Sequence, residues 1–396
     1  MTNQDNQFSI DSLSNHPEHR CINIRWKDGH HSKFHYIWLR HTCFYPANAG
    51  DNPRDETFRI PDDPTKLFVT DIAVLINSVL IQWSNDGKTT CHDVQWLRRH
   101  CYSKAARTIR KHKLKNWDGI TASHLRRFHF DDLESEDTIY DLLLQIRDYG
   151  LARIRNVPNT EKGIKQLAAL FGPIRETNYG RIFHIRTDSD IEIAANKSSF
   201  LSPHTDENYR HAPPGISIFH CLEATCIGGE SILVDGFLAA ERLAKHKPAE
   251  FSLLTKHPIR FVGDSNDNGH MWASGRVICL DDDGDIIGIR YTDRTLPPLD
   301  LPEDLIEPMY RALGAFASEI YKPELSMRYM MRSGDTHIFD NQRVLHGRTC
   351  FDASTGTRHL QQCAVERDEF HYRLRLLAIQ RNSDDSGLVM AGGALG

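Results

Sequence analysis

From about residue 180 onward the chain is a series of short apolar segments separated by glycine and proline, and this pattern limits the folds available to it. One of these segments, 215–222, alternates Ile216, Ile218, His220 and Leu222 with mostly smaller residues, as a strand with one buried face does. A helical segment, 302–321, interrupts them. Many short strands with long insertions predict a double-stranded β-helix, or jelly roll. The candidate strands are 215–222, 231–234, 276–280, 286–291, 336–340 and 360–366.

The first hundred residues form a second β-rich region. Its candidate strands end at turn-forming sequences such as DG, NPRD and NDG. Residues 104–135 are polar and predict a connector, and two amphipathic helices follow it. We therefore expect a mainly β protein with flanking helices: a small β-rich N-terminal domain, 1–112, before a jelly-roll catalytic domain, 113–396. The candidate strands are 21–27, 33–38, 67–75 and 78–83, and the candidate helices are 138–149 and 161–171.

Composition narrows the class of protein. The 396 residues carry a net charge of -5, and 40% of them are hydrophobic. We expect no membrane partner, because no run of about 18 apolar residues occurs. Nucleic acid is also not expected, and the basic stretch 98–127 is interpreted as a solvated face. Nine cysteines without close pairing and a polar N-terminus favour a reducing, cytoplasmic location.

Three side chains predict a metal centre. His204 and Asp206 stand two residues apart in PHTDENY, at the end of a candidate strand, where they would point to the same side. His346, in FDNQRVLHGR, lies on a later candidate strand. Two histidines and one carboxylate form the facial triad of non-haem iron(II) oxygenases, which leaves coordination positions open. A second His-x-Asp pair, His129 and Asp131, lies in the charged connector and is interpreted as chance.

Two further residues fit a dicarboxylate cosubstrate. Arg358 follows His346 on the next candidate strand, and arginine holds a carboxylate as a two-pronged donor. Ser231, beside a glycine turn, offers a hydroxyl for the same carboxylate. We therefore expect 2-oxoglutarate as cosubstrate. A non-catalytic cupin-like module and a metal-dependent hydrolase are the competing classes, but no HExxH motif or bridging carboxylate pair supports a hydrolase.

A series of motifs along most of the chain resembles one family. The chain is similar to the γ-butyrobetaine and trimethyllysine hydroxylase branch of the taurine-dioxygenase superfamily. The resemblance implies hydroxylation of a small molecule with iron(II), 2-oxoglutarate and O2, with ascorbate as an activator, in a homodimer. The motifs are WLRHTC (38–43), RDYGLARIRNVP (147–158), PHTDENY (203–209), PPGISIFHC (213–221), GGESILVDGF (229–237), FDNQRVLHGR (339–348), RHLQQCAVERDE (358–369) and RLRLLAIQR (373–381).

The same resemblance implies an aromatic cage for a trimethylammonium group, which binds to π-faces because it cannot donate a hydrogen bond. Tyr179 and Phe183 stand where the family has cage aromatics, and Tyr209 follows the metal motif. Two other cage positions depart from the family, since Asn196 and Ala364 stand where tyrosines are expected. The cage is therefore thinner than in a γ-butyrobetaine hydroxylase.

The substrate's anionic end also departs from the family pattern. Asp293 replaces an asparagine, and Arg294 and Arg290 lie beside it. More cationic groups favour a phosphonate over a carboxylate. We therefore expect 2-(trimethylammonio)ethylphosphonate as substrate. The alternative is γ-butyrobetaine, and a second alternative is trimethyllysine or a protein-directed reaction.

Relatives in this family often carry a structural zinc in the first domain. Here Cys43 and His92 are the ligands that remain, and His41 and Cys91 are further candidates. Two plausible ligands do not make a closed tetrahedral site. We therefore predict no structural zinc, or one with altered ligands.

Overall fold

The computed structural model describes residues 8–42, 59–160, 162–186, 196–263, 270–294, 296–381, 383 and 393–394. The contacts within the chain divide it into two compact units, residues 1–111 and 112–396. Each unit has its own buried core.

In its described residues, the first unit contains two three-stranded antiparallel sheets and three short α-helices. The indole rings of Trp26 and Trp83 are fully buried between them, and each donates a hydrogen bond to a threonine or serine hydroxyl. The strands are β1 (Ile10–His16), β2 (Cys21–Trp26), β3 (His31–His35), β4 (Val69–Val74), β5 (Ser78–Trp83) and β6 (Thr89–Asp93), and the helices are α1 (Tyr36–Thr42), α2 (Val94–Arg99) and α3 (Lys104–Arg110).

One predicted strand of this unit is wrong at its C-terminal end. The candidate strand 33–38 stops at His35, and α1 begins at Tyr36. Tyr36, Leu39 and Arg40 are the buried residues of α1, so burial here follows a helical spacing rather than the alternation of a strand.

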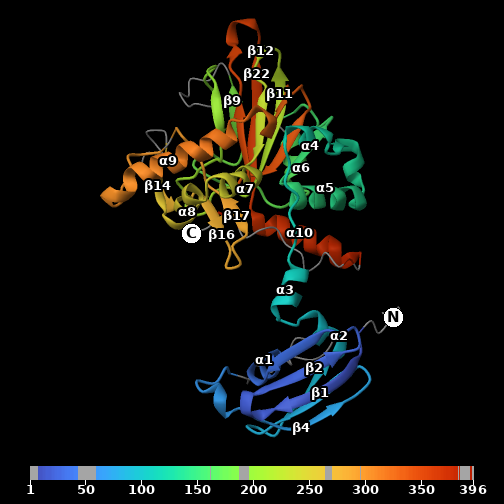
Figure 1. The fold of residues 1–396 in the computed structure, drawn as a ribbon. Helices are drawn as coiled ribbons and strands as arrows, with labels where there is room; N and C mark the ends of the chain where they lie inside the picture. Colours follow the sequence, from blue (N-terminus) through green and yellow to red (C-terminus); the bar gives the residue numbers. More distant parts are fainter. Residues whose placement is uncertain are drawn as a thin grey trace. The chain divides into compact units, whose positions relative to one another are not determined.

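The second unit is built on a six-stranded and a four-stranded sheet. Their orders are β7-β8-β19-β11-β22-β9 and β10-β20-β13-β18, and all pairs are antiparallel except β7 with β8. Figure 1 shows β9, β22 and β11 side by side. The larger sheet comprises β7 (Arg127–His129), β8 (Leu151–Arg155), β9 (Phe183–Arg186), β11 (Ile216–Ala224), β19 (Thr336–Asp340) and β22 (Arg358–Val365), and the smaller comprises β10 (Leu201–His204), β13 (Ser231–Asp235), β18 (Ser326–Tyr329) and β20 (Val344–Arg348).

The two sheets face each other. Phe219 of β11 and Phe339 of β19 lie with their ring centroids 5.1 and 4.9 Å from that of His346, which belongs to β20 in the smaller sheet. The outer face of the larger sheet packs on α5 and α10, and that of the smaller sheet packs on α7 and α9. Side chains that point inward from both sheets therefore meet in the space between them.

The helices and short hairpins of this unit surround the two sheets. The helices are α4 (Gly119–His124), α5 (Glu136–Tyr149), α6 (Gly163–Ala168), α7 (Gly236–His246), α8 (Pro248–Lys256), α9 (Glu303–Ile320) and α10 (Arg367–Gln380). The two-stranded pairs are β12 (Ile227–Gly228) with β21 (Phe351–Asp352), β14 (Ile259–Val262) with β15 (Trp272–Gly275), and β16 (Ile278–Leu280) with β17 (Ile286–Ile289).

The segment 104–135, predicted to be a connector, contains regular structure. The N-termini of α3 and α4 are capped by Ser103 and Asp118, whose side chains accept hydrogen bonds from backbone N–H groups. Strand β7 then pairs with β8 at the edge of the larger sheet. Capping stabilises α3 and α4, and edge pairing stabilises β7, although the polar composition of this segment alone predicted a linker.

Candidate active site

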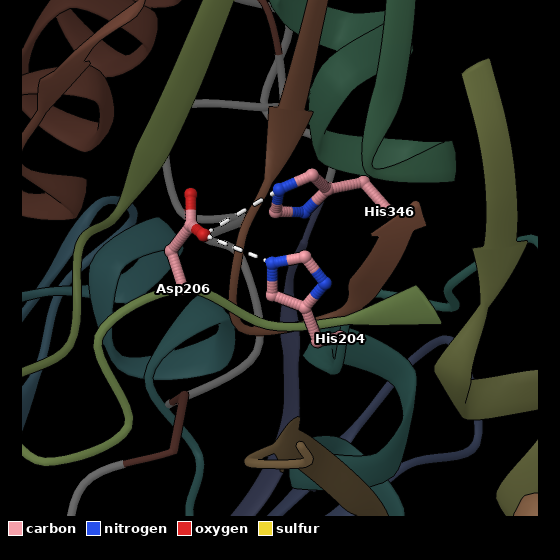
Figure 2. Close-up of side chains that lie close together, drawn as sticks. All are labelled: His204, Asp206 and His346. Atoms are coloured by element: carbon pink, nitrogen blue, oxygen red, sulfur yellow. Dashed lines mark ion pairs between the residues drawn. The ribbon is translucent and has the colours of Figure 1, made fainter. Parts of the chain in front are cut away.

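Two histidines on neighbouring strands form the base of the site. His204 ends β10 and lies directly opposite His346 in the antiparallel register with β20. Their ring centroids are 4.4 Å apart. The carboxylate of Asp206 completes the group: its Oδ1 lies 3.4 Å from Nε2 of His204 and 3.5 Å from Nε2 of His346. Figure 2 shows the carboxylate pointing toward both rings.

Asp206 does not lie on a strand, contrary to our expectation. Strand β10 ends at His204, so the alternation of a strand does not bring the two side chains together. The side chain of Asn341 holds the loop instead. Its Oδ1 accepts from the backbone N–H of Asp206 at 2.7 Å, and its Nδ2 donates to the Asp206 carbonyl at 3.2 Å.

A hydrogen bond and burial prepare the imidazole of His204 for a metal. Nδ1 of His204 donates to the carbonyl of Ser202 at 2.8 Å, which leaves Nε2 unprotonated and directed at Asp206. Burial and the neighbouring His346 lower the pKa of His204. Although burial opposes it, electrostatic interaction and hydrogen bonding with His346 and His204 hold the pKa of Asp206 well below its usual range.

The donor set fits a divalent first-row metal. His204, Asp206 and His346 offer ligand atoms that all lie within 4.8 Å of one another, and they are the one such group found in the described ranges. Two nitrogens and one carboxylate oxygen suit iron(II) and leave coordination positions for other ligands. The three residues would hold the metal through Nε2, Nε2 and Oδ1.

A cavity of about 70 Å³ lies on the Arg358 side of the three residues. Arg358 and Ser231 line it, together with apolar residues from both sheets. The guanidinium of Arg358 is buried and, among the described residues, has neither a hydrogen-bond nor an ion-pair partner. Burial lowers its pKa. Arg348 lines the same cavity, but its guanidinium already donates to the carbonyls of Lys197 and Ser199.

A second, larger cavity of about 140 Å³ opens beside His204 and Asp206. Tyr179, Phe183 and Tyr209 all line it. The rings of Tyr179 and Phe183 are 5.4 Å apart at 62°, and the hydroxyls of Tyr179 and Tyr209 are 3.5 Å apart. The three predicted aromatics therefore form one aromatic corner next to the metal-ligand group.

The predicted anion-binding residues do not lie together. Arg294 lines the larger cavity, but Arg290 does not. Arg290 is fully buried, and its guanidinium donates to the backbone carbonyls of Asn208, His211 and Ala394. The structure therefore gives this side chain backbone partners and not a place on the cavity wall, because adjacency in sequence does not reveal which way a buried side chain points.

Asp293 and Asn196 also lie outside the walls of both cavities. The carboxylate of Asp293 accepts hydrogen bonds from the hydroxyls of Ser202 and Tyr321, at 2.7 and 2.6 Å. The side chain of Asn196 accepts from the backbone N–H of Arg186 at the end of β9, at 3.2 Å. Neither residue is placed to contact a substrate in the larger cavity.

Several residues at the site were not predicted. Gln362 of β22 donates from Nε2 to Oδ2 of Asp206 at 2.6 Å. Gln362 lies four residues after Arg358 on one strand, so both side chains point to the inner face. The alternation of the strand could therefore have predicted that Gln362 faces the site. Arg175 and Arg181 line the larger cavity and lie in a segment, 172–182, without strand or helix periodicity.

The zinc prediction for the first unit stays a prediction. Cys43 lies outside the described residues. Cys91 and His92 are neighbours on β6 and point to opposite faces, since Cys91 is exposed and His92 is buried. Nε2 of His92 lies 3.0 Å from the hydroxyl of Thr90.

Comparisons with known proteins agree with this site. The family model described as "Taurine catabolism dioxygenase TauD, TfdA family" matches residues 110–364. The γ-butyrobetaine dioxygenase of Pseudomonas sp. (strain AK-1) is 32% identical over 365 residues, which cover 91% of this chain and 94% of that protein. The human γ-butyrobetaine dioxygenase is 27% identical over 366 residues, covering 90% and 94%. Human mitochondrial trimethyllysine dioxygenase is 30% identical over 355 residues, covering 88% and 83%.

None of the helices described here is both long and apolar enough to cross a membrane. The family match spans more than half of the chain, and it includes His204, Asp206, His346 and Arg358. The chain therefore belongs to the TauD/TfdA family and is a dioxygenase.

Proposed function

We propose that this dioxygenase hydroxylates a small trimethylammonium zwitterion and uses iron(II) and 2-oxoglutarate. The observation that carries the proposal is the group of His204, Asp206 and His346 between two cavities of different chemistry. One cavity holds a buried arginine, and the other holds an aromatic corner. We further propose that the two facing sheets form a jelly roll, with its site between the sheets.

The smaller cavity suits 2-oxoglutarate. A buried guanidinium without a counter-ion is unfavourable until an anion binds it, and a carboxylate matches its two parallel N–H donors. Arg358 meets these conditions, and Ser231 on the facing sheet adds a hydroxyl. Phe219, Leu233 and Leu360 line the rest of the cavity and exclude water around the cosubstrate's carbon chain.

Bound iron(II), with 2-oxoglutarate and O2, supplies the oxidising power for hydroxylation of a C–H bond, with succinate and carbon dioxide formed. The chain's own residues determine position. His204 and His346 are held by paired strands and Asp206 by Asn341, so the metal ligands need little rearrangement. The substrate's orientation in the larger cavity then selects the carbon that reacts.

The aromatic corner suits a quaternary ammonium group. Such a cation interacts favourably with the faces of tyrosine and phenylalanine rings, by about 0.5–2 kcal/mol per contact. Tyr179, Phe183 and Tyr209 present these rings within one cavity that also reaches His204 and Asp206. A substrate held there by its ammonium end would have its carbon chain beside the metal.

We propose γ-butyrobetaine as the first candidate substrate. The support is the similarity to γ-butyrobetaine dioxygenases over almost their whole length. The phosphonate analogue, 2-(trimethylammonio)ethylphosphonate, is the second candidate. Arg290 no longer supports this candidate, because it does not line the larger cavity. Arg181 and Arg294 do line it, and neither side chain has an ion-pair partner among the described residues. Two such cations favour an anion with more than one negative charge.

Succinate release from 2-oxoglutarate tests the proposal. The full chain, loaded with iron(II), would be assayed with γ-butyrobetaine, the phosphonate and free trimethyllysine in parallel. We expect turnover coupled to γ-butyrobetaine hydroxylation that is lost in His204→Ala. A larger kcat/KM for the phosphonate would reverse the order of the two candidates. Absence of coupled turnover with all three would contradict a trimethylammonium substrate.

We also propose that the enzyme is a cytoplasmic homodimer activated by ascorbate. These proposals rest on the family resemblance and on the cysteine content. Sedimentation equilibrium of the full chain tests the dimer, and omission of ascorbate from the succinate assay tests the activator.

A further inference from the structure

The carboxylate of Asp206 has two oxygens in different surroundings. Oδ1 lies 3.4 Å and 3.5 Å from the two histidine Nε2 atoms, so it is the oxygen that faces the metal position. Oδ2 points away and accepts a hydrogen bond from Nε2 of Gln362 at 2.6 Å. A short hydrogen bond to a carboxylate is among the stronger kinds in proteins.

Gln362 also stands at the border between the two cavities. It is one of a few residues that line both of them, together with Leu201, His204 and Asp206. On β22 it follows Arg358 by four residues on the same inner face. The strand that holds the cosubstrate's proposed anchor therefore also contacts the carboxylate ligand.

We propose that Gln362 is a positioning residue for the metal centre. Its side-chain N–H holds Oδ2, so Asp206 binds the metal through Oδ1 alone. Without this hydrogen bond the carboxylate could rotate, so a metal would have to order it on binding and would bind more weakly. In some orientations both oxygens would face the metal and would take a coordination position that 2-oxoglutarate needs. The inference rests on the proposed function, because it assumes a metal at His204, Asp206 and His346.

The neighbouring Gln361 provides a matched control. It is the same residue type on the same strand, but it points to the opposite face, where its side chain is fully buried and lines neither cavity. A change that acts only through the stability of β22 would appear in both variants. A change that acts through Asp206 would appear only at Gln362.

The experiment measures binding of Mn(II) alone to the full chain, by calorimetry without cosubstrate or substrate. The variants are Gln362→Met, Gln361→Met and His204→Ala, and circular dichroism with the thermal midpoint of each metal-free variant confirms folding. Loss of a group that orients a metal ligand costs about 10- to 100-fold in metal affinity. We expect Gln362→Met to raise the Kd for Mn(II) at least tenfold, with Gln361→Met unchanged. In Mn(II)-loaded Gln362→Met, we also expect weaker 2-oxoglutarate binding.

The outcomes separate this inference from the proposed function. If the wild type binds one Mn(II), His204→Ala does not, and Gln362→Met binds as the wild type does, the role of Gln362 is overturned while the metal site stands. Equal weakening in Gln361→Met would also overturn it, as a general effect on the strand. A folded wild type that binds no Mn(II) would overturn both proposals.

Discussion

Replacing Arg358 with methionine should sharply weaken 2-oxoglutarate binding. Methionine keeps much of the apolar stem but removes the charge and all five N–H donors. Arg358 is buried on the inner face of β22, and burial already lowers its pKa. In the cosubstrate complex, its guanidinium and a carboxylate would neutralise each other away from water.

The size of the effect follows from that burial. Truncating one partner of a buried, hydrogen-bonded charge pair costs about 2 to 5 kcal/mol. Since each 1.4 kcal/mol is a factor of ten, a loss of about 2 to 5 kcal/mol raises the Kd for 2-oxoglutarate roughly 30- to 4000-fold. The Kd of Arg358→Lys for 2-oxoglutarate should lie between those of the wild type and Arg358→Met, because lysine keeps the charge but lacks the two-pronged geometry.

The assay is titration of 2-oxoglutarate into the Mn(II)-loaded full chain. Arg294→Met serves as the control, because Arg294 lines the larger cavity and not the one that contains Arg358. We expect its Kd for 2-oxoglutarate to match that of the wild type. The reasoning fails if Arg358→Met binds 2-oxoglutarate within threefold of the wild type, or if Arg294→Met loses as much affinity.

Two predictions concern stability. Burial, with the charges of Arg153 and Arg127, lowers the pKa of His337 from 6.5 to about 3, so the unfolded chain takes up a proton first as pH falls. The free energy of unfolding should therefore fall by about 2 kcal/mol between pH 6.5 and pH 5 through this group. Denaturant unfolding of His337→Asn should show a smaller pH dependence of this free energy than the wild type does. Arg343→Met should lower the free energy of unfolding by about 3–5 kcal/mol, because it leaves the fully buried carboxylate of Asp235 without its counter-ion. As a control, Arg126→Met removes an exposed ion pair and should lower the same free energy by about 1 kcal/mol or less.

The sequence predicted the bounds of two strands with different burial. The candidate strand 78–83 has the bounds of β5, whose burial alternates along the strand, and 336–340 has the bounds of β19, in which all five residues are buried. His204, Asp206 and His346, the residues predicted to bind a metal, lie together in the structure, although the assumed reason for their convergence, strand alternation, was wrong for Asp206.

The residues that line the larger cavity were harder to predict than the metal-ligand group, for a physical reason. The direction of a side chain in an irregular loop depends on tertiary contacts that a local pattern does not encode. Arg290 and Arg294 are four residues apart, yet one donates to backbone carbonyls in the interior and the other lines the larger cavity. Gln362, by contrast, lies on a regular strand, so its inward direction follows from that of Arg358.

The loop that carries Asp206 needs as much rigidity as a strand, and hydrogen bonds from several elements supply it. Beyond the two from Asn341, the backbone N–H of Thr205 donates to the carbonyl of Tyr291 at 2.9 Å. Arg290 donates to the carbonyls of Asn208 and His211 in the same loop. Such bonding can hold Glu207 at a φ of 50°, a conformation that non-glycine residues seldom adopt. Because the loop places Asp206 in the metal-ligand group and Tyr209 at the aromatic corner, holding it rigid fixes the distance between those two groups. Arg290 therefore supports the shape of the larger cavity from behind the loop, without lining that cavity.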